Sequence, residues 1–337
     1  MYKTRSNKMN LRKFYYLLLL LPLLFINTAC SDDNNGTDPV SINETEVLVK
    51  YLEGSDGGFI NTAAPAMIKS SDVMTNITTG ANQAVIDIRS AADYANGHID
   101  GSVNVLLKDI VSYYEANNLS SKTVVVIACY SGQTAGYATA LLRLLGYSNV
   151  KDLKWGMCSW NSATAAGWNS NMKNTRASQF VKTNTPKAAA GSLPTLNTGK
   201  TTGAEILRAR IDAMLAADGF NDVKVSSDAV YASLSNYYIV NYWSATDYSW
   251  GHIEGAIQYT PGSDLKSGTF LKTLPTDKMI AVYCYTGQTS AHVAAYLKIL
   301  GYDAKTVLYG VNAMAYDNMP GTRFIPETEI HDYELVK

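Results

Sequence analysis

Cysteine is scarce in this chain of 337 residues, which contains only four. The sequence has no Cys-x-x-Cys pair and no Cys/His cluster with zinc-ligand spacing, so we expect neither a disulfide scaffold nor a metal site. Proline is also infrequent, with nine residues, whereas 47% of the residues are hydrophobic. This composition excludes disorder and collagen-like repeats, and the length predicts two domains of roughly 150 residues each.

Acidic residues are absent from the first 29 residues, which carry five Lys and Arg residues. Without that segment the chain has 23 basic residues (28 minus 5) and 29 acidic residues, a net charge of −6. A mildly acidic body argues against nucleic acid as a partner.

The basic N-terminus is followed by thirteen uncharged residues, Phe14 to Ile26. As a helix they would span only about 20 Å, which is short of a hydrocarbon core of roughly 30 Å, so they predict a secretory signal. The pair Ala29-Cys30 resembles the cleavage site of a bacterial lipoprotein signal, although Asn27 stands where that signal usually has Leu. An ordinary signal peptide cut at Ala29 and an uncleaved anchor are the alternatives.

The lipoprotein resemblance implies a signal peptide over residues 1–29, lipidation of Cys30 and a polar, flexible tether over residues 30–42. The protein is then expected in the cell envelope, held by its lipid anchor at the outer membrane, on either the periplasmic or the surface face.

The rest of the chain contains an internal duplication. Five landmarks recur in the same order 154 to 156 residues further on: Ser70 at Ser226, Gly97 at Gly251, Cys129 at Cys284, Gly146 at Gly301 and Gly156 at Gly310. A period of this length indicates two whole domains rather than a solenoid of small units. We predict domains over residues 43–170 and 203–337, with residues 171–202 as a linker that could lie over one of them.

Each copy alternates short β-branched runs with helical patterns. Residues 84–88 and 123–128 have the composition of buried parallel strands, and 135–145 form an amphipathic helical pattern that ends at Gly146. The second copy repeats this order over residues 239–240, 279–283 and 290–300. The alternation predicts an α/β fold in which each domain is a parallel β-sheet flanked by helices.

The cysteine of each copy ends a buried strand, and the helical pattern begins six residues later. The first N–H groups of a helix have no intrahelical partner and carry partial positive charge, so a thiol there is expected to have a lowered pKa. Gly132 and Gly287 allow the loop N–H groups to converge on an anion.

The combined motifs resemble the rhodanese-like sulfurtransferases, one domain per copy. The residues that carry the resemblance are Asp87-Ile88-Arg89, Asp93-Tyr94, Gly97 to Ser102, the loop Cys-x-x-Gly-x-Thr, Trp155-Gly156 and Trp160. The resemblance implies that a cysteine takes a sulfane sulfur from a small donor, thiosulfate or a persulfide, and passes it to a thiol or cyanide acceptor, with no cofactor.

The resemblance assigns the sulfur carriers to Cys129 and Cys284. Two loops would cradle the persulfides: Tyr130, Ser131, Gly132, Gln133 and Thr134 in the first copy, and Tyr285, Thr286, Gly287, Gln288 and Thr289 in the second. Neither loop contains Arg or Lys, which disfavours the phosphate chemistry of related phosphatases because a dianion needs a matching cation.

Arg89 stands at a family position that can bind the anionic group of the donor. The second copy has Asn241 and Trp243 where the first has Asp87 and Arg89, so we expect the first domain to have the better claim to catalysis. The alternative for Arg89 is a structural ion pair with Asp87 or Asp93.

Two alternatives stay open at this point. The chain could be a non-catalytic binding module, or a thiol redox protein that pairs Cys129 with Cys158, although packing is the simpler role for Cys158. His98 and His252 are expected to hydrogen-bond backbone groups rather than to act as bases.

Overall fold

The computed structural model describes residues 42–337 apart from residue 218. The range Ile42–Lys337 forms one compact unit that contains both copies of the repeat. The predicted signal peptide, the lipidation site Cys30 and all of the predicted tether except Ile42 lie outside the described residues. No helix within the described range is long and apolar enough to cross a membrane.

Two five-stranded sheets form the framework, with strand orders β1-β5-β4-β2-β3 and β6-β10-β9-β7-β8, and every paired strand is parallel. The strands of the first sheet are β1 (Met67–Ile68), β2 (Gln83–Asp87), β3 (Val103–Asn104), β4 (Val124–Ala128) and β5 (Val150–Leu153). Those of the second are β6 (Lys224–Val225), β7 (Tyr237–Asn241), β8 (Ile257–Gln258), β9 (Met279–Tyr283) and β10 (Ala304–Val307).

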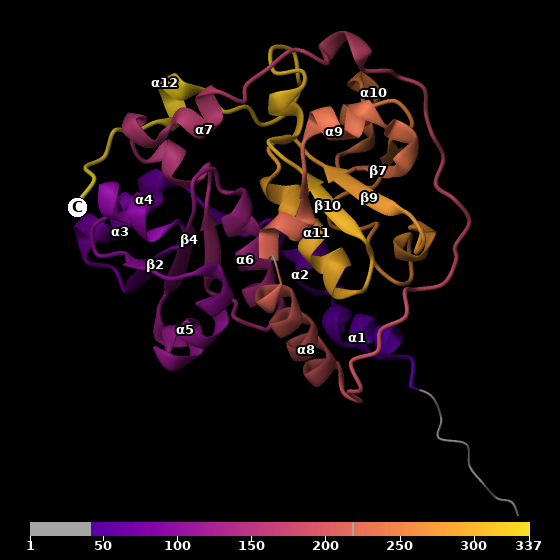
Figure 1. The fold of residues 1–337 in the computed structure, drawn as a ribbon, viewed down its shortest axis with the longest axis horizontal. Helices are drawn as coiled ribbons and strands as arrows, with labels where there is room; N and C mark the ends of the chain where they lie inside the picture. Colours follow the sequence, from indigo (N-terminus) through magenta and orange to yellow (C-terminus); the bar gives the residue numbers. More distant parts are fainter. Residues whose placement is uncertain (1–41, 218) are drawn as a thin grey trace, which may run out of the picture. The chain divides into compact units, whose positions relative to one another are not determined.

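Helices flank both sheets (Figure 1). They are α1 (Glu44–Glu53), α2 (Gly58–Thr62), α3 (Ser70–Thr79), α4 (Ala91–Asn96), α5 (Ile110–Ala116), α6 (Gln133–Leu144), α7 (Ala166–Asn169), α8 (Gly203–Ala216), α9 (Ser227–Ala232), α10 (Ala245–Trp250), α11 (Gln288–Ile299) and α12 (Pro326–Glu329). The predicted α/β architecture of two tandem parallel sheets is therefore confirmed.

The central strands β4 and β9 bring the cysteines to the same edge of each sheet. Every residue of β4 is buried, and only Met279 of β9 is partly exposed, which explains their continuous apolar sequences. Since parallel strands end at one edge, Cys129 and Cys284 stand at the carboxyl edge, where open α/β sheets bind ligands.

The helices after the cysteines begin two residues earlier than we expected. α6 starts at Gln133 and α11 at Gln288, four residues after each cysteine. Gly132 (φ 83°) and Gly287 (φ 77°) are the N-caps in the left-handed conformation, and a glycine adopts this conformation without strain. The loop is therefore tighter than the hydrophobic period indicated.

The two helices α6 and α11 pack against each other between the sheets (Figure 1). Gly136 permits this close approach, because an added Cβ there would lie 3.1 Å from the Gln288 carbonyl oxygen. The largest hydrophobic cluster accordingly spans both copies, with Ile127 and Leu141 from the first and Val282 and Leu297 from the second. The two repeats thus share one core.

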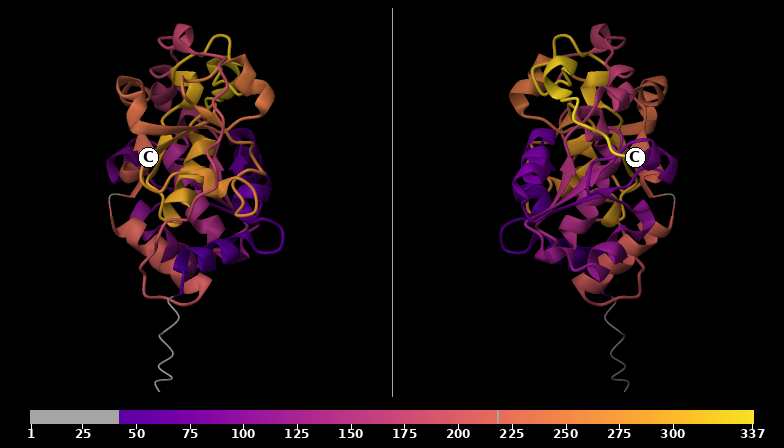
Figure 2. Two further views of the ribbon diagram at one scale, coloured as in Figure 1. Left: turned by 90° about the vertical axis from the view of Figure 1, so that its right-hand side faces the viewer. Right: turned by 90° about the vertical axis from the view of Figure 1, so that its left-hand side faces the viewer.

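The segment that follows each sheet crosses to the other repeat's side of the molecule. Within the predicted linker, Val181 forms an antiparallel bridge with His252 of the second repeat. At the C-terminus, Val336 forms the matching bridge with His98 of the first repeat. Figures 1 and 2 show the yellow C-terminal segment running back beside the first sheet. Each repeat therefore has a backbone partner from a segment outside its own sheet. The second repeat pairs with the linker that precedes it, and the first pairs with the C-terminal segment that follows the second.

The N-terminal helices also reach across. Although residues 43–62 belong to the predicted first domain, Glu44 accepts hydrogen bonds from Thr198 and Gly199 at 2.6–2.8 Å. The Asn61 amide donates to the Leu265 carbonyl at 3.2 Å. The repeats can consequently be delimited in sequence, but they fold as one body.

Candidate functional site

Backbone N–H groups hold the sulfur of Cys129 at the N-terminus of α6. Gly132 donates to Sγ at 3.2 Å and Ala135 at 3.3 Å. Gly132 belongs to the predicted cradle, whereas Ala135 lies one residue beyond it. A set of converging N–H donors stabilises negative charge on sulfur.

The second loop repeats this geometry and adds hydroxyl groups. Cys284 Sγ accepts from the N–H groups of Gly287 at 3.2 Å and Ser290 at 3.3 Å. The Ser290 hydroxyl also lies 3.4 Å from Sγ and 2.7 Å from the hydroxyl of Thr306. Ser290 was outside the predicted cradle because the loop motif ends at Thr289.

The first repeat replaces this hydroxyl pair by Ala135 and Asp152, at the positions equivalent to Ser290 and Thr306. Burial raises the pKa of the Cys129 thiol to about 11, the loop N–H groups lower it, and the charge of Asp152 raises it further. The lowered pKa that we expected at Cys129 is therefore wrong. The helix N-terminus is present, but loss of solvation outweighs it.

Aromatic residues cover the first loop. Trp168 donates from Nε1 to the Ser131 carbonyl at 3.1 Å. It belongs to a fully buried cluster with Trp155, Cys158 and Phe324. Cys158 has no exposed surface and burial raises its pKa to about 11, so its position is that of a packing residue.

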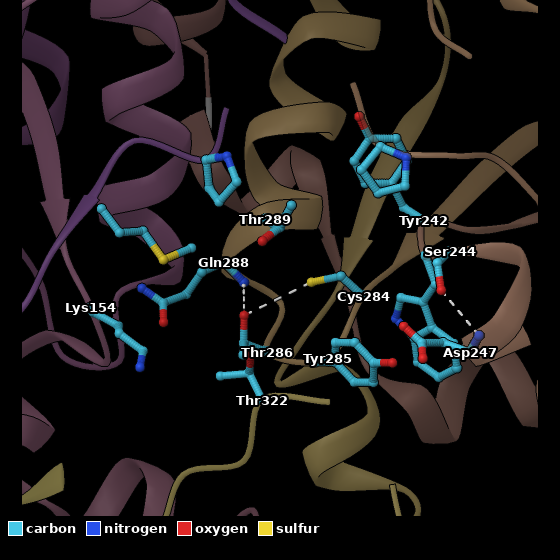
Figure 3. A pocket seen from close by; sticks show the side chains of 14 residues that line it. Lys154, Tyr242, Ser244, Asp247, Cys284, Tyr285, Thr286, Gln288, Thr289 and Thr322 are labelled. Atoms are coloured by element: carbon cyan, nitrogen blue, oxygen red, sulfur yellow. Dashed lines mark hydrogen bonds between the residues drawn. The ribbon is translucent and has the colours of Figure 1, made fainter. Parts of the chain in front are cut away.

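The second loop, in contrast, opens on a cavity of about 360 Å³ (Figure 3). Its wall is largely apolar and includes Pro65, Met67, Tyr242, Trp243, Pro261 and Tyr285. Its polar lining comprises Cys284, Ser244, Asp247, Thr286, Gln288, Thr289, Thr322 and Lys154. Pro65, Met67 and Lys154 belong to the first repeat, so both repeats build the site around Cys284.

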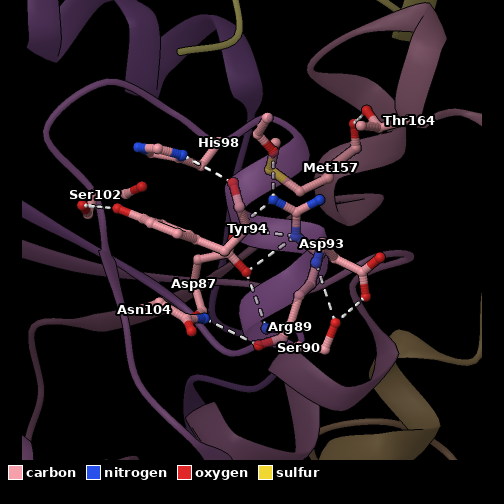
Figure 4. Close-up of polar contacts among 11 residues, drawn as sticks. Asp87, Arg89, Ser90, Asp93, Tyr94, His98, Ser102, Asn104, Met157 and Thr164 are labelled. Carbon is pink, nitrogen blue, oxygen red and sulfur yellow. Dashed lines mark hydrogen bonds and ion pairs between the residues drawn. The ribbon is translucent and has the colours of Figure 1, made fainter. Parts of the chain in front are cut away.

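Arg89 does not lie free beside Cys129. Its Nη2 forms an ion pair with Asp87 at 2.6 Å and donates to the Gly97 carbonyl at 2.7 Å (Figure 4). Its side chain is only 2% exposed. The structure thus shows the ion-pair alternative, and the predicted role of Arg89 in donor binding has no free cation to support it. Sequence spacing could not reveal that Asp87 occupies the guanidinium.

The histidines that recur in the two copies, His98 and His252, hydrogen-bond backbone groups, as expected. His98 Nδ1 lies 2.9 Å from the Tyr94 carbonyl oxygen, and its ring stacks on Tyr94. His252 Nδ1 lies 2.8 Å from the Tyr248 carbonyl oxygen and its Nε2 lies 2.9 Å from that of Thr183. All three of these contacts are made to backbone carbonyl oxygens and none to a cysteine sulfur.

The predicted cradle residues Gln133 and Gln288 reach across to the opposite repeat. Gln133 Oε1 accepts the backbone N–H of Tyr309 at 2.7 Å, and Gln288 Oε1 accepts that of Trp155 at 3.1 Å. Tyr309 and Trp155 are themselves equivalent residues of the two copies. Each glutamine therefore links the sulfur loop of its own repeat to the segment after the last-numbered strand of the other repeat. The sequence did not indicate this role.

A buried polar contact lies beside Gln288. Gln288 also donates to the Asp152 carboxylate at 3.1 Å, and His292 Nε2 lies 3.2 Å from the same carboxylate. Because Asp152 is in the first repeat and His292 is in α11, this network spans the interface. The side chains of Asp152 and His292 have no exposed surface.

Among residues 42–337 without 218, no group of three or more His, Cys, Asp or Glu residues is arranged to hold a metal ion. The three cysteines of this range, Cys129, Cys158 and Cys284, are free. Cys129 and Cys284 therefore present free thiols at the carboxyl edge of the sheets.

Each copy is a parallel β-sheet flanked by helices, with a cysteine loop at the N-terminus of a helix. This arrangement defines a class of α/β proteins in which backbone N–H groups hold a cysteine sulfur. The chain belongs to the rhodanese-like domain family, whose model matches residues 70–163 and 228–315. The resemblance that the motifs indicated is confirmed.

Among its relatives is the thiosulfate sulfurtransferase GlpE of Pseudomonas fluorescens, 35% identical over 82 residues, which are 24% of this chain and 73% of that protein. GlpE of Shewanella oneidensis is 28% identical over 96 residues, covering 28% of this chain and 93% of the relative. A solved thiosulfate sulfurtransferase from Pseudomonas aeruginosa matches with 16% identity and a TM-score of 0.28, over 79% of this chain and 46% of that one.

Cysteine alkylation should distinguish the two loops. We expect iodoacetamide to modify Cys284 at least about tenfold faster than Cys129 near neutral pH, because Cys284 lines a cavity, whereas burial and Asp152 raise the pKa of the Cys129 thiol. The Cys129 rate should rise about tenfold per pH unit between about pH 7 and 9, since the thiolate fraction grows in this proportion below its pKa of about 11. Peptide mapping by mass spectrometry measures both rates; a faster or pH-independent reaction at Cys129 would contradict the described environment.

Removing the interdomain glutamines should destabilise the protein. We expect Gln288→Ala to lower the free energy of unfolding by about 1–3 kcal/mol, because the Trp155 N–H and the Asp152 carboxylate lose a buried partner. Gln133→Ala should have a smaller effect, since its removal leaves the Tyr309 N–H and the Ser131 hydroxyl without this partner but affects no carboxylate. Urea unfolding measures these changes, with the exposed Gln179→Ala as control within about 0.5 kcal/mol of wild type. If both glutamine variants unfold with the same free energy as the Gln179→Ala control, the hydrogen bonds of Gln133 and Gln288 across the repeats do not contribute to stability.

Proposed function

We propose that this protein is a sulfurtransferase of the rhodanese type that carries a sulfane sulfur on cysteine. Support comes from its membership of the rhodanese-like family and from relatives that are named thiosulfate sulfurtransferases. The observation that carries the proposal is the position of Cys284, whose sulfur accepts two backbone N–H bonds at the base of a cavity.

The proposed reaction has two displacement steps. The cysteine thiolate attacks the outer sulfur of the donor, the donor S–S bond breaks, and its electron pair leaves with sulfite when the donor is thiosulfate or with a thiolate when it is a persulfide. The new cysteine persulfide is then attacked at its outer sulfur by a thiol or cyanide acceptor, which regenerates the cysteine. Both steps are redox-neutral overall, so they need no cofactor.

The chain's own groups would act on the sulfur throughout this cycle. The N–H groups of Gly287 and Ser290 would stabilise the thiolate before attack and the terminal persulfide sulfur after it. The Ser290 hydroxyl oxygen accepts a hydrogen bond from the Cys284 thiol at 3.4 Å, a contact that Ala135 cannot make with Cys129. These differences favour the second repeat as the main sulfur carrier, opposite to the expectation based on Arg89.

Replacement of the cysteines tests the proposal. We expect Cys284→Ser to remove more than about nine-tenths of thiosulfate:cyanide sulfurtransferase activity, because serine cannot form a persulfide, while Cys129→Ser retains most of it. Cys158→Ala is the matched control and should leave turnover within about twofold of wild type. Dominant loss in Cys129→Ser would instead assign catalysis to the first repeat. If neither cysteine affects turnover, or if neither thiosulfate nor a persulfide supports any turnover, the sulfurtransferase proposal fails.

We further propose that residues 1–29 are removed, that Cys30 is lipidated and that the protein is anchored to the outer membrane. The support is the basic start, the apolar run and the Ala29-Cys30 pair. In a Gram-negative host, the wild-type chain should fractionate with membranes, and Cys30→Ala should release it or block its processing. Wild-type protein found only in the soluble periplasmic fraction would refute the anchor.

A further inference from the structure

The cavity at Cys284 is much larger than thiosulfate requires. Its volume of about 360 Å³ lies in the range of roughly 300–1,000 Å³ that is typical of sites for organic ligands. Thiosulfate has five heavy atoms and would leave most of this space to water. The dimensions therefore point to a sulfur donor with a carbon body.

The cavity wall has an aromatic residue at a position where the first repeat has an arginine. Trp243 occupies the position equivalent to Arg89, and its ring stacks on Tyr285 with centroids 4.5 Å apart and an interplanar angle of 13°. In the first repeat, Arg89 lies over the Tyr130 ring instead, at 5.4 Å. The second repeat thus has an indole where the first has an arginine that is paired with Asp87, and the indole adds apolar surface to this part of the wall.

The charges around the cavity do not favour a small dianion. Lys154 is the one cationic residue among its lining residues, and its Nζ lies 3.4 Å from the Glu329 carboxylate. Asp247 adds a negative group, on the side of Cys284 opposite Lys154 in Figure 3. With one cation facing two carboxylates, the cavity lacks the positive field that would concentrate thiosulfate.

We infer that the second site takes an organic persulfide with an aromatic or bulky aliphatic body, R–S–SH, as its sulfur donor. This inference rests on the proposed function and specifies its substrate. The Cys284 thiolate attacks the outer sulfur, the S–S bond of the donor breaks, and R–S⁻ departs with the electron pair and takes up a proton. The body R lies against the stacked Trp243 and Tyr285 rings and against Met67, which the first repeat contributes.

Methyl and benzyl persulfide form a matched pair of donors, because they differ only in the phenyl ring. Sulfur loading of Cys284 is followed by mass spectrometry of the peptide that contains it, at limiting donor and fixed pH, with thiosulfate as a third donor. We expect benzyl persulfide to load wild-type Cys284 at least about tenfold faster than methyl persulfide, because burial of the ring removes apolar surface from water.

Two variants test whether this cavity makes the selection. Met67→Ser, at a partly exposed position, and Trp243→Leu, which removes the stacked ring, should each reduce the benzyl-over-methyl preference by about three- to tenfold. Loading from methyl persulfide is measured in parallel and should fall less than loading from benzyl persulfide, because its body makes less contact with the wall. Lys151→Met is the control, since Lys151 is exposed on β5 close in sequence to Lys154, and it should leave all rates unchanged. Met67→Ser remains informative if Trp243→Leu does not fold.

The outcomes separate this inference from the proposed function. If no donor adds the mass of one sulfur to Cys284, sulfur transfer at this site fails. If thiosulfate and both persulfides load Cys284 equally well, or if the benzyl preference persists in both folded variants, sulfur transfer stands and the organic donor is refuted.

Discussion

The packing of α6 against α11 is the contact on which the rest of the structure depends. These helices follow the two cysteines directly, so their contact sets the sulfur loops back to back and merges two potential cores into one. It also brings Gln133 and Gln288 within reach of the opposite repeat. The close approach requires a small residue at Gly136, which a long aliphatic side chain could not replace without separating the helices.

The buried strands, their parallel order and the cysteine loops were predictable from the sequence because each depends on local patterns. β9 coincides with the predicted range 279–283, and the cysteines stand at the strand ends as expected. The partners of polar groups were predictable only in part. The ion pair of Arg89 with Asp87 was one of two roles that the sequence left open for Arg89. The contact of Asp152 with His292 had no signal in the sequence, since it depends on how the two repeats dock. A pattern within one repeat carries no information on that arrangement.

Duplication has produced two sites with the same backbone and different surroundings. Both sulfurs accept two N–H bonds at nearly identical distances, so the loop geometry alone does not distinguish them. The neighbouring side chains do, because Ala135 and Asp152 in the first site are replaced by Ser290 and Thr306 in the second. A carboxylate disfavours a nearby sulfur anion, whereas a hydroxyl can donate to it. Both cysteines are equally buried, at 4% exposure, but the first loop packs against Trp168 whereas Cys284 lines a cavity.

The two matching bridges differ in the length of chain that each one closes. His98 and Val336 are 238 residues apart (336 minus 98), whereas Val181 and His252 are 71 residues apart (252 minus 181). The entropy lost on closing a loop grows with the logarithm of its length, so the longer closure costs about 1 kcal/mol more. The bridge of the first repeat is therefore the less favourable one to form from an open chain, although the two bridges have the same antiparallel geometry in the folded protein.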